Sequence, residues 1–202
     1  MKKETHLREF DDVVFGNLQE IILSVDVGSN RFIEDTNKAS TVATLLGFSK
    51  SYQRVVILEC WVIPAVSHDA IIKECEEKIE WWWVRYMQKF RKIVIDSAES
   101  ILINTWREKN KFSTILVKGA IKHVPRQIDL VSRCELKQQL LLQERLIWTT
   151  HALNSYNAHT RILLDEDGSE LDLSVQDNDT ADSLTYGLTE NWNYLTKQIR
   201  RA

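Results

Sequence analysis

The feature that most constrains the fold is the apolar run IILSVDVG at residues 21–28. A short run of aliphatic and β-branched residues of this kind predicts a buried strand. Asp26 interrupts the run, and a carboxylate inside a buried strand is costly unless a cation, a proton or several hydrogen-bond donors balance its charge. Asp26 is therefore either an ordinary buried carboxylate satisfied by loop amides or part of a site built around negative charge.

Two further acidic residues stand in contexts that bring them toward the same place. Asp96 directly follows the apolar run at residues 92–95, and Asp182 lies in the first turns of a helix predicted near the end of the sequence. Carboxylates that meet without Lys or Arg between them repel one another, and they stay ionised together only with divalent cations among them. Hard oxygen ligands favour Mg²⁺ or Mn²⁺ over zinc.

A pair of such ions about 4 Å apart is the arrangement that hydrolyses phosphodiesters in line, since one ion activates water and the other stabilises the leaving oxygen. In this arrangement Asp26 would bridge the two ions, and Asp96 and Asp182 would each favour one of them. If the three carboxylates converge, the sequence therefore predicts a phosphodiester-hydrolysing centre with two divalent cations.

The order of the predicted elements indicates an α/β protein. The 202 residues are enough for one sizeable core, and we expect a single domain over 1–202, with a polar lead-in at 1–20 and the folded core at 21–199. The second and third strands are expected to form an antiparallel hairpin, within a mixed sheet flanked by helices. The periodicities predict strands at 21–27, 41–48, 54–63, 92–96, 113–117 and 145–149, helices at about 69–90, 100–110, 126–142, 150–157 and 178–198, and a β-hairpin at 161–175.

The charge distribution favours a basic face beside an acidic pocket. The formal net charge of −3 argues against a dedicated nucleic-acid clamp, but basic residues predominate at 107–137 and acidic ones at 161–190. A solvated surface position is the ordinary role of any single basic residue. The candidates for contacts to nucleic-acid phosphates are Lys118, Lys122, Arg126 and Arg133, together with Lys111.

The cysteine content and the hydropathy indicate a cytoplasmic protein. The three cysteines include no CxxC pair, so we expect reduced thiols rather than a zinc ribbon or a disulfide framework. The polar N-terminus lacks the apolar segment of a signal peptide, and no apolar run is long enough to cross a bilayer. No membrane partner is therefore expected.

Three motifs carry a resemblance to a known family. SVDVG contains Asp26, VIDSAES contains Asp96 and TADSLTYGL contains Asp182, with a three-strand meander and a helix between the first two. This order resembles the ribonuclease H-like nuclease fold and, more narrowly, the C-terminal nuclease domain of the large terminase subunit of tailed phages, over about residues 20–190. The resemblance implies a ribonuclease H-like fold in which the 161–175 hairpin lies near the acidic site and restricts the entry of DNA.

The resemblance also implies an activity and its residues. It implies a metal-dependent endonuclease that cuts double-stranded DNA, as in terminase cleavage of concatemeric viral DNA during genome packaging, with Asp26, Asp96 and Asp182 catalytic. Many relatives carry His three residues before the last Asp, where this chain has Asp179. Asp179 would replace that His as a metal ligand, or Asp177 would assist, but both residues are equally explained as charges that favour a helix N-terminus.

Two alternatives and a set of partners remain open at this point. The chain has no GxxxxGK[ST] phosphate loop, so the packaging ATPase must belong to another domain or polypeptide. The resemblance implies double-stranded DNA, a packaging ATPase domain, the portal and the small terminase subunit as partners. The alternatives are another ribonuclease H-like enzyme, such as a junction resolvase or an RNA–DNA hybrid nuclease, and a non-catalytic docking module of a packaging motor.

Overall fold

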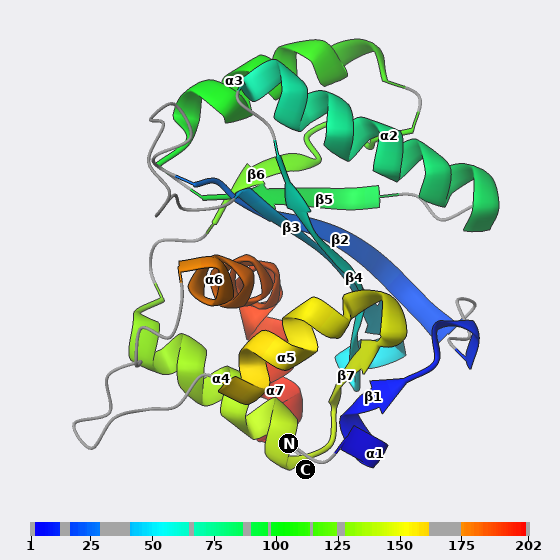
Figure 1. Ribbon diagram of the computed structural model, residues 1–202, viewed down its shortest axis with the longest axis vertical. Coiled ribbons are helices and arrows are strands. Elements are labelled where there is room, and N and C mark those ends of the chain that lie inside the picture. Colours follow the sequence, from blue (N-terminus) through cyan, green and yellow to red (C-terminus); the bar gives the residue numbers. More distant parts are fainter. Residues whose placement is uncertain are drawn as a thin grey trace.

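A mixed β-sheet between two layers of helices forms the core of the computed structural model (Figure 1). The structure describes residues 3–12, 17–28, 41–64, 67–86, 90–96, 98–113, 115–124, 128–161 and 175–200. Within these residues the sheet has seven strands in the order β1-β7-β4-β3-β2-β5-β6. The strands are β1 (Leu7–Arg8), β2 (Leu18–Asp26), β3 (Thr41–Ser49), β4 (Val55–Ile63), β5 (Phe90–Ile95), β6 (Ile121–His123) and β7 (Leu146–Thr149).

The strand directions explain why the sheet is mixed. β2, β3 and β4 form an antiparallel meander, which confirms the predicted hairpin of the second and third strands. β5 runs parallel to β2, and β6 runs parallel to β5. On the other side of the meander, β7 runs parallel to β4 and β1 runs parallel to β7. The predicted α/β class with a central mixed sheet is therefore confirmed.

Helices cover both faces of the sheet (Figure 1). One layer contains α2 (His68–Tyr86) and α3 (Ser100–Lys109), and the other contains α4 (Leu130–Leu142), α5 (Leu153–Arg161), α6 (Val175–Glu190) and α7 (Trp192–Ile199). Successive residues of a strand point to opposite faces, so Leu23 and Val25 pack into the first layer and Ile22 packs into the second. Both faces of β2 are buried, and Gln19 is its one residue that is only partly buried.

The structure differs from the predicted polar lead-in at residues 1–20, because the described residues 3–12 and 17–20 of this segment are part of the fold. α1 (Lys3–His6) leads directly into β1, which pairs with β7 at the edge of the sheet. Phe10 is buried and its ring stacks on His151 at 4.1 Å between ring centroids. These contacts join residues far apart in the sequence, so local patterning gave no signal for them.

The predicted strand at 113–117 was also wrong. Among the described residues of this segment only Leu116 pairs with a strand, through a single bridge to Phe90, and the strand that extends the sheet is β6. The Ser113 hydroxyl accepts hydrogen bonds from the N–H groups of Ile115 and Leu116, at 3.3 and 3.2 Å. Hydrogen bonds of this local kind compete with the ladder of a sheet.

The predicted C-terminal helix at 178–198 is two helices, because the chain turns at Asn191 between α6 and α7. The Asn191 side chain donates a hydrogen bond to Glu20 at 2.8 Å and accepts one from Lys92 at 3.0 Å. Lys92 also contacts the carboxylates of Glu20 and Glu190, each at 3.3 Å, in a largely buried network. These long-range contacts hold the turn in place.

Several element boundaries also differ from the predictions. α2 ends at Tyr86, and Phe90, the expected end of this helix, is a fully buried residue of β5. α4 begins at Leu130 because the Asp129 carboxylate caps it, accepting from the Ser132 N–H at 2.8 Å. The predicted hairpin at 161–175 lies outside the described residues except at its ends, which are the last residue of α5 and the first residue of α6.

The remaining fold-level expectations concern thiols and membranes. Cys60, Cys75 and Cys134 are all free, as expected from their spacing. None of the helices in the described part of the chain is long and apolar enough to cross a membrane.

Candidate functional site

Two of the predicted site residues lie side by side at one edge of the sheet. Asp26 is the last residue of β2, and Asp96 directly follows the last residue of β5. The two strands are parallel neighbours, with Val25 opposite Ile95. One further step along both strands places Asp26 beside Asp96, so the carboxyl ends of the strands bring these two carboxylates together.

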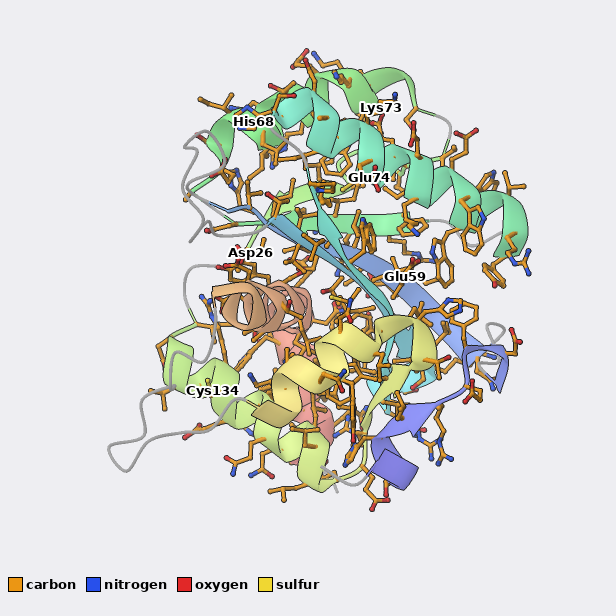
Figure 2. The ribbon with its side chains drawn as sticks, in the orientation of Figure 1. Asp26, Glu59, His68, Lys73, Glu74 and Cys134 are labelled. Atoms are coloured by element: carbon orange, nitrogen blue, oxygen red, sulfur yellow. The ribbon has the colours of Figure 1, made fainter. Side chains whose placement is uncertain are left out.

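Helix α6 covers the same edge from one side. Side chains alternate along a strand, so Asp26 shares a face of the sheet with Ser24, and α6 packs on that face. The Ser183 hydroxyl on α6 donates to the Ser24 carbonyl at 3.1 Å and bonds the Thr44 hydroxyl at 3.0 Å. Figure 2 shows Asp26 at the end of its strand, beside α6.

Glycine sets how closely α6 approaches the sheet. A methyl group at Gly187 would lie 2.5 Å from Leu46 Cδ1 and 3.2 Å from Ser24 Cβ, both well inside ordinary contact distances. Leu46 is fully buried in β3, so its side chain has little room to move. The absence of a side chain at Gly187 therefore allows α6, with Asp182 one turn earlier, to lie directly on the strands.

Four carboxylates meet at this place. Asp179 and Asp182 are three residues apart, so they occupy the same face of α6. Burial and, after it, the negative charges of Asp182, Asp179 and Asp96, in that order of size, together raise the pKa of Asp26 from 3.8 to about 8. Only 8% of Asp26 is exposed. The structure therefore brings Asp26, Asp96, Asp179 and Asp182 into one acidic cluster.

Tyr186 completes the cluster, and the sequence argument gave it no role. Burial raises the pKa of its phenol, and the carboxylates of Asp26, Asp182 and Asp96 add to the shift, so the phenol stays neutral. The four-residue spacing from Asp182 places both side chains on one face of α6. This spacing was the feature of the sequence from which Tyr186 could have been identified as a site residue.

The chemistry of the acidic cluster fits a hard divalent cation better than any other group. Carboxylate oxygens are the ligands of Mg²⁺ and Mn²⁺, and bound cations would relieve the repulsion that raises the pKa of Asp26. Within the described residues no three His, Cys, Asp or Glu side chains are already arranged to hold a metal ion. The side chain of Asp177, the other predicted candidate, lies outside the described residues.

The loop after Asp96 holds its carboxylate in place. The Ala98 N–H donates to Asp96 Oδ1 at 3.2 Å, and the Glu99 N–H donates to the Asp96 carbonyl at 3.1 Å. The Glu99 carboxylate lies 3.6 Å from His68 Nε2, and the Glu99 side chain is only 16% exposed. The Glu99 side chain is therefore largely shielded from solvent.

The predicted phosphate contacts are dispersed around the sheet. Arg133 lies near the acidic cluster, where its charge acts on Tyr186, and its Nε donates to the Ile128 carbonyl at 2.9 Å. Lys122 lies on β6 with its ammonium 3.2 Å from the Glu190 carboxylate. Lys118 is exposed in the turn before β6, at the end of that strand that is farther from Asp96. Arg126 lies outside the described residues.

Comparison of sequences identifies no relative of this chain. No protein-family model and no curated protein matches it. Comparison of structures, by contrast, finds several solved proteins with the same arrangement of strands and helices over nearly the whole chain.

Two of these solved structures are isolated nuclease domains. The nuclease domain of the bacteriophage P22 large terminase has 12% sequence identity and a TM-score of 0.62, over 99% of this chain and 95% of that domain. The large terminase nuclease domain of bacteriophage SPP1, solved with bound Mn, has 14% identity and a TM-score of 0.58, over 92% of this chain and 96% of that domain.

The third is a longer protein, the large terminase of a thermophilic bacteriophage, with 11% identity and a TM-score of 0.66. The match covers 94% of this chain but only 43% of the terminase, so this chain spans less than half of that protein's length. The predicted fold is confirmed: this chain has the ribonuclease H-like fold of the nuclease domains of phage large terminases.

Proposed function

We propose that this protein is a metal-dependent endonuclease that cuts double-stranded DNA by hydrolysing phosphodiester bonds, as terminases do to concatemeric viral DNA during genome packaging. The observation that carries the proposal is the placement of Asp26 and Asp96 at the ends of the parallel strands β2 and β5, with α6 packed on β2, where burial and then the charges of Asp182, Asp179 and Asp96 raise the pKa of Asp26. Such a cluster is destabilising unless cations or protons occupy it. The fold adds support, since nuclease domains of phage terminases share it.

The acidic cluster supplies the groups that this chemistry needs. In the proposal Asp26, Asp96 and Asp182 are catalytic and hold two Mg²⁺ or Mn²⁺ ions, with Asp179 as a further ligand. The ions would activate a water molecule and stabilise the leaving oxygen. Asp26 is buried at the end of β2, so bulk water has little access to its carboxylate. In the proposal the neutral phenol of Tyr186 would donate a hydrogen bond to a carboxylate or to a phosphate oxygen.

The proposed partners follow from the proposed endonuclease function. DNA would meet the protein through phosphate contacts, for which Lys118, Lys122, Arg126 and Arg133 are our candidates. A packaging ATPase domain, in this or another polypeptide, would supply DNA translocation, with the portal and the small terminase subunit as further partners.

A non-catalytic docking module of a packaging motor is the second candidate. One observation favours it, namely that no three His, Cys, Asp or Glu side chains among the described residues are arranged to hold a metal ion. A docking module would keep the fold without binding divalent ions, so metal binding separates the two candidates.

The test is cleavage of supercoiled plasmid DNA in Mn²⁺, Mg²⁺ or EDTA. We expect nicking and linearisation that need the metal and are lost in Asp26→Asn, because the variant removes one charge and keeps the shape. Asp69→Asn is the matched control, since Asp69 is exposed and pairs with Lys109 within the layer of α2 and α3, on the opposite face of the sheet from α6. A folded protein that cuts with neither metal, and that no divalent ion stabilises, would contradict the proposal and favour the docking module.

A further inference from the structure

A basic pocket lies at the outer edge of the sheet, between the end of α3 and the turn that precedes β6. Its volume is about 540 Å³, and its charged lining residues are Arg107, Lys111 and Lys118. The neighbouring pocket, in contrast, is lined by Glu76 and Glu80 as well as by a lysine. None of the described residues that line the first pocket is acidic, so its positive charge is local.

The three cations are available to an anionic ligand. Arg107 Nε donates to the Ile121 carbonyl at 3.1 Å, which fixes the guanidinium against β6. Its terminal N–H groups make no hydrogen bond to the described residues, so they can donate to a ligand. Lys118 is exposed and has no ion-pair partner in the described part of the chain. Lys111 pairs with Glu108, but both side chains are largely exposed, so solvent screens the pair.

The register of the sheet gives the distance from the pocket to the acidic cluster. Leu116, which lines the pocket, bridges to Phe90 at the start of β5, whereas Asp96 follows the end of β5. The six residues of β5 therefore separate the Leu116 end of the pocket from Asp96, whereas the Ile121 end, which pairs with Ile93, lies nearer. At about 3.3 Å per residue the separation of the Leu116 end from Asp96 is about 20 Å. Successive base pairs rise about 3.4 Å, so this separation corresponds to about 6 base pairs of duplex.

We propose that this pocket binds the phosphate backbone of the same DNA duplex whose phosphodiester lies at the acidic cluster, about 6 base pairs away. The inference rests on the proposed function, because it takes the substrate to be duplex DNA. β6 is the last strand of the sheet, so a duplex can run along the open edge from the pocket to Asp96. A second phosphate contact fixes the register of the duplex without reading its sequence.

The first experiment measures binding in the absence of metal, and it does not depend on cleavage. A fluorescent duplex of about 24 base pairs is titrated in EDTA over a range of NaCl concentrations. Each phosphate contact contributes about 0.9 to the magnitude of the negative slope of log K against log salt. The double variant Lys111→Glu with Lys118→Glu should therefore make this slope less steep by about 2. Near 0.1 M salt this corresponds to about 50-fold weaker binding.

The matched control is Lys73→Glu, which reverses a similarly exposed charge on α2. Its slope should equal that of the parent chain. An unchanged slope in the double variant, or an equal loss in the Lys73 control, would overturn the proposal. Both altered lysines are exposed and circular dichroism checks that the variants fold.

The second experiment tests the spacing by cleavage in Mn²⁺. A hairpin duplex of about 8 base pairs, centred on the acidic cluster, extends only about 14 Å to either side and cannot reach the Leu116 end of the pocket. The double variant should therefore lose a much larger share of the parent chain's kcat/KM on the long duplex than on the short one. An equal loss on both lengths would overturn the spacing. If the parent chain cuts neither duplex, the proposed function fails, and the salt slope still decides whether the pocket binds DNA.

Discussion

Replacing Asp26 by Asn should stabilise the protein at alkaline pH in the absence of metal. Asp26 is 8% exposed, and burial together with three neighbouring carboxylates raises its pKa to about 8. In the unfolded chain the same carboxyl group ionises near its ordinary pKa of 3.8. Between these two values the folded protein binds a proton that the unfolded chain has lost, so its free energy of unfolding falls as the pH rises.

The size of the effect follows from the two pKa values. Each pKa unit corresponds to about 1.36 kcal/mol, and the values differ by about four units, so the loss is complete at about pH 8 and reaches about 5 kcal/mol. Asparagine has nearly the same shape and no charge, so the variant avoids this loss. The gain of Asp26→Asn over the parent chain should therefore be about 1 to 2 kcal/mol near pH 5 and grow to at most about 5 kcal/mol at about pH 8.

Urea unfolding of both proteins at several pH values in EDTA measures this difference, and a second series with Mn²⁺ completes the test. The ion should stabilise the parent chain, because it binds only the folded state, and should have much less effect on the variant. Asp69→Asn is the control: Asp69 is exposed and Lys109 lowers its pKa, so the variant should gain nothing at alkaline pH.

The reasoning would be refuted by equal stability of Asp26→Asn and the parent chain at about pH 8 in EDTA. A gain of the same size at acid and alkaline pH would refute it as well. Either result would mean that the Asp26 carboxylate is well solvated and that the edge of the sheet does not concentrate negative charge.

Three further substitutions probe the support of the site. Gly187→Ala places a methyl group against buried Leu46, so α6 must shift. We expect the free energy of unfolding in urea to fall by about 1 to 2 kcal/mol and plasmid cleavage to become slower. If both values were unchanged, the helix would have room for the methyl group. Lys92→Met leaves two buried carboxylates without their shared cation and should cost about 3 to 5 kcal/mol, measured in the same way, with metal affinity of the folded protein retained. Tyr186→Phe should keep the stability and lower the cleavage rate about tenfold or more, and an unaltered rate would exclude a role for the phenol.

The part of the site that lies on strands was predictable from the sequence. Asp26 and Asp96 each end a strongly apolar run, and parallel strands bring their carboxyl ends to one edge. The strand order needed for that inference came from the resemblance of the motifs, as did the position of Asp182. The assigned roles of these residues stay predictions.

The errors fall where contacts that the periodicity of a strand or helix does not reflect decide the local structure. β6 has only three residues, too few to show a period of two, and hydrogen bonds to Ser113 hold the neighbouring apolar segment in a turn. The helix break at Asn191 depends on Glu20 and Lys92, which are remote in the sequence. Periodicity within one window contains no information about such partners.

The docking of α6 has a consequence for the folding of the chain. The bond from Ser183 to the Ser24 carbonyl spans 159 residues, so it belongs to the least local contacts of the fold. Contacts that close such long loops form late, because the entropy of the intervening chain opposes them. During synthesis β2 and β5 leave the ribosome well before α6 does. A partly made chain therefore displays two of the carboxylates without the helix that brings the others, and the acidic cluster is complete only when the whole sheet has folded.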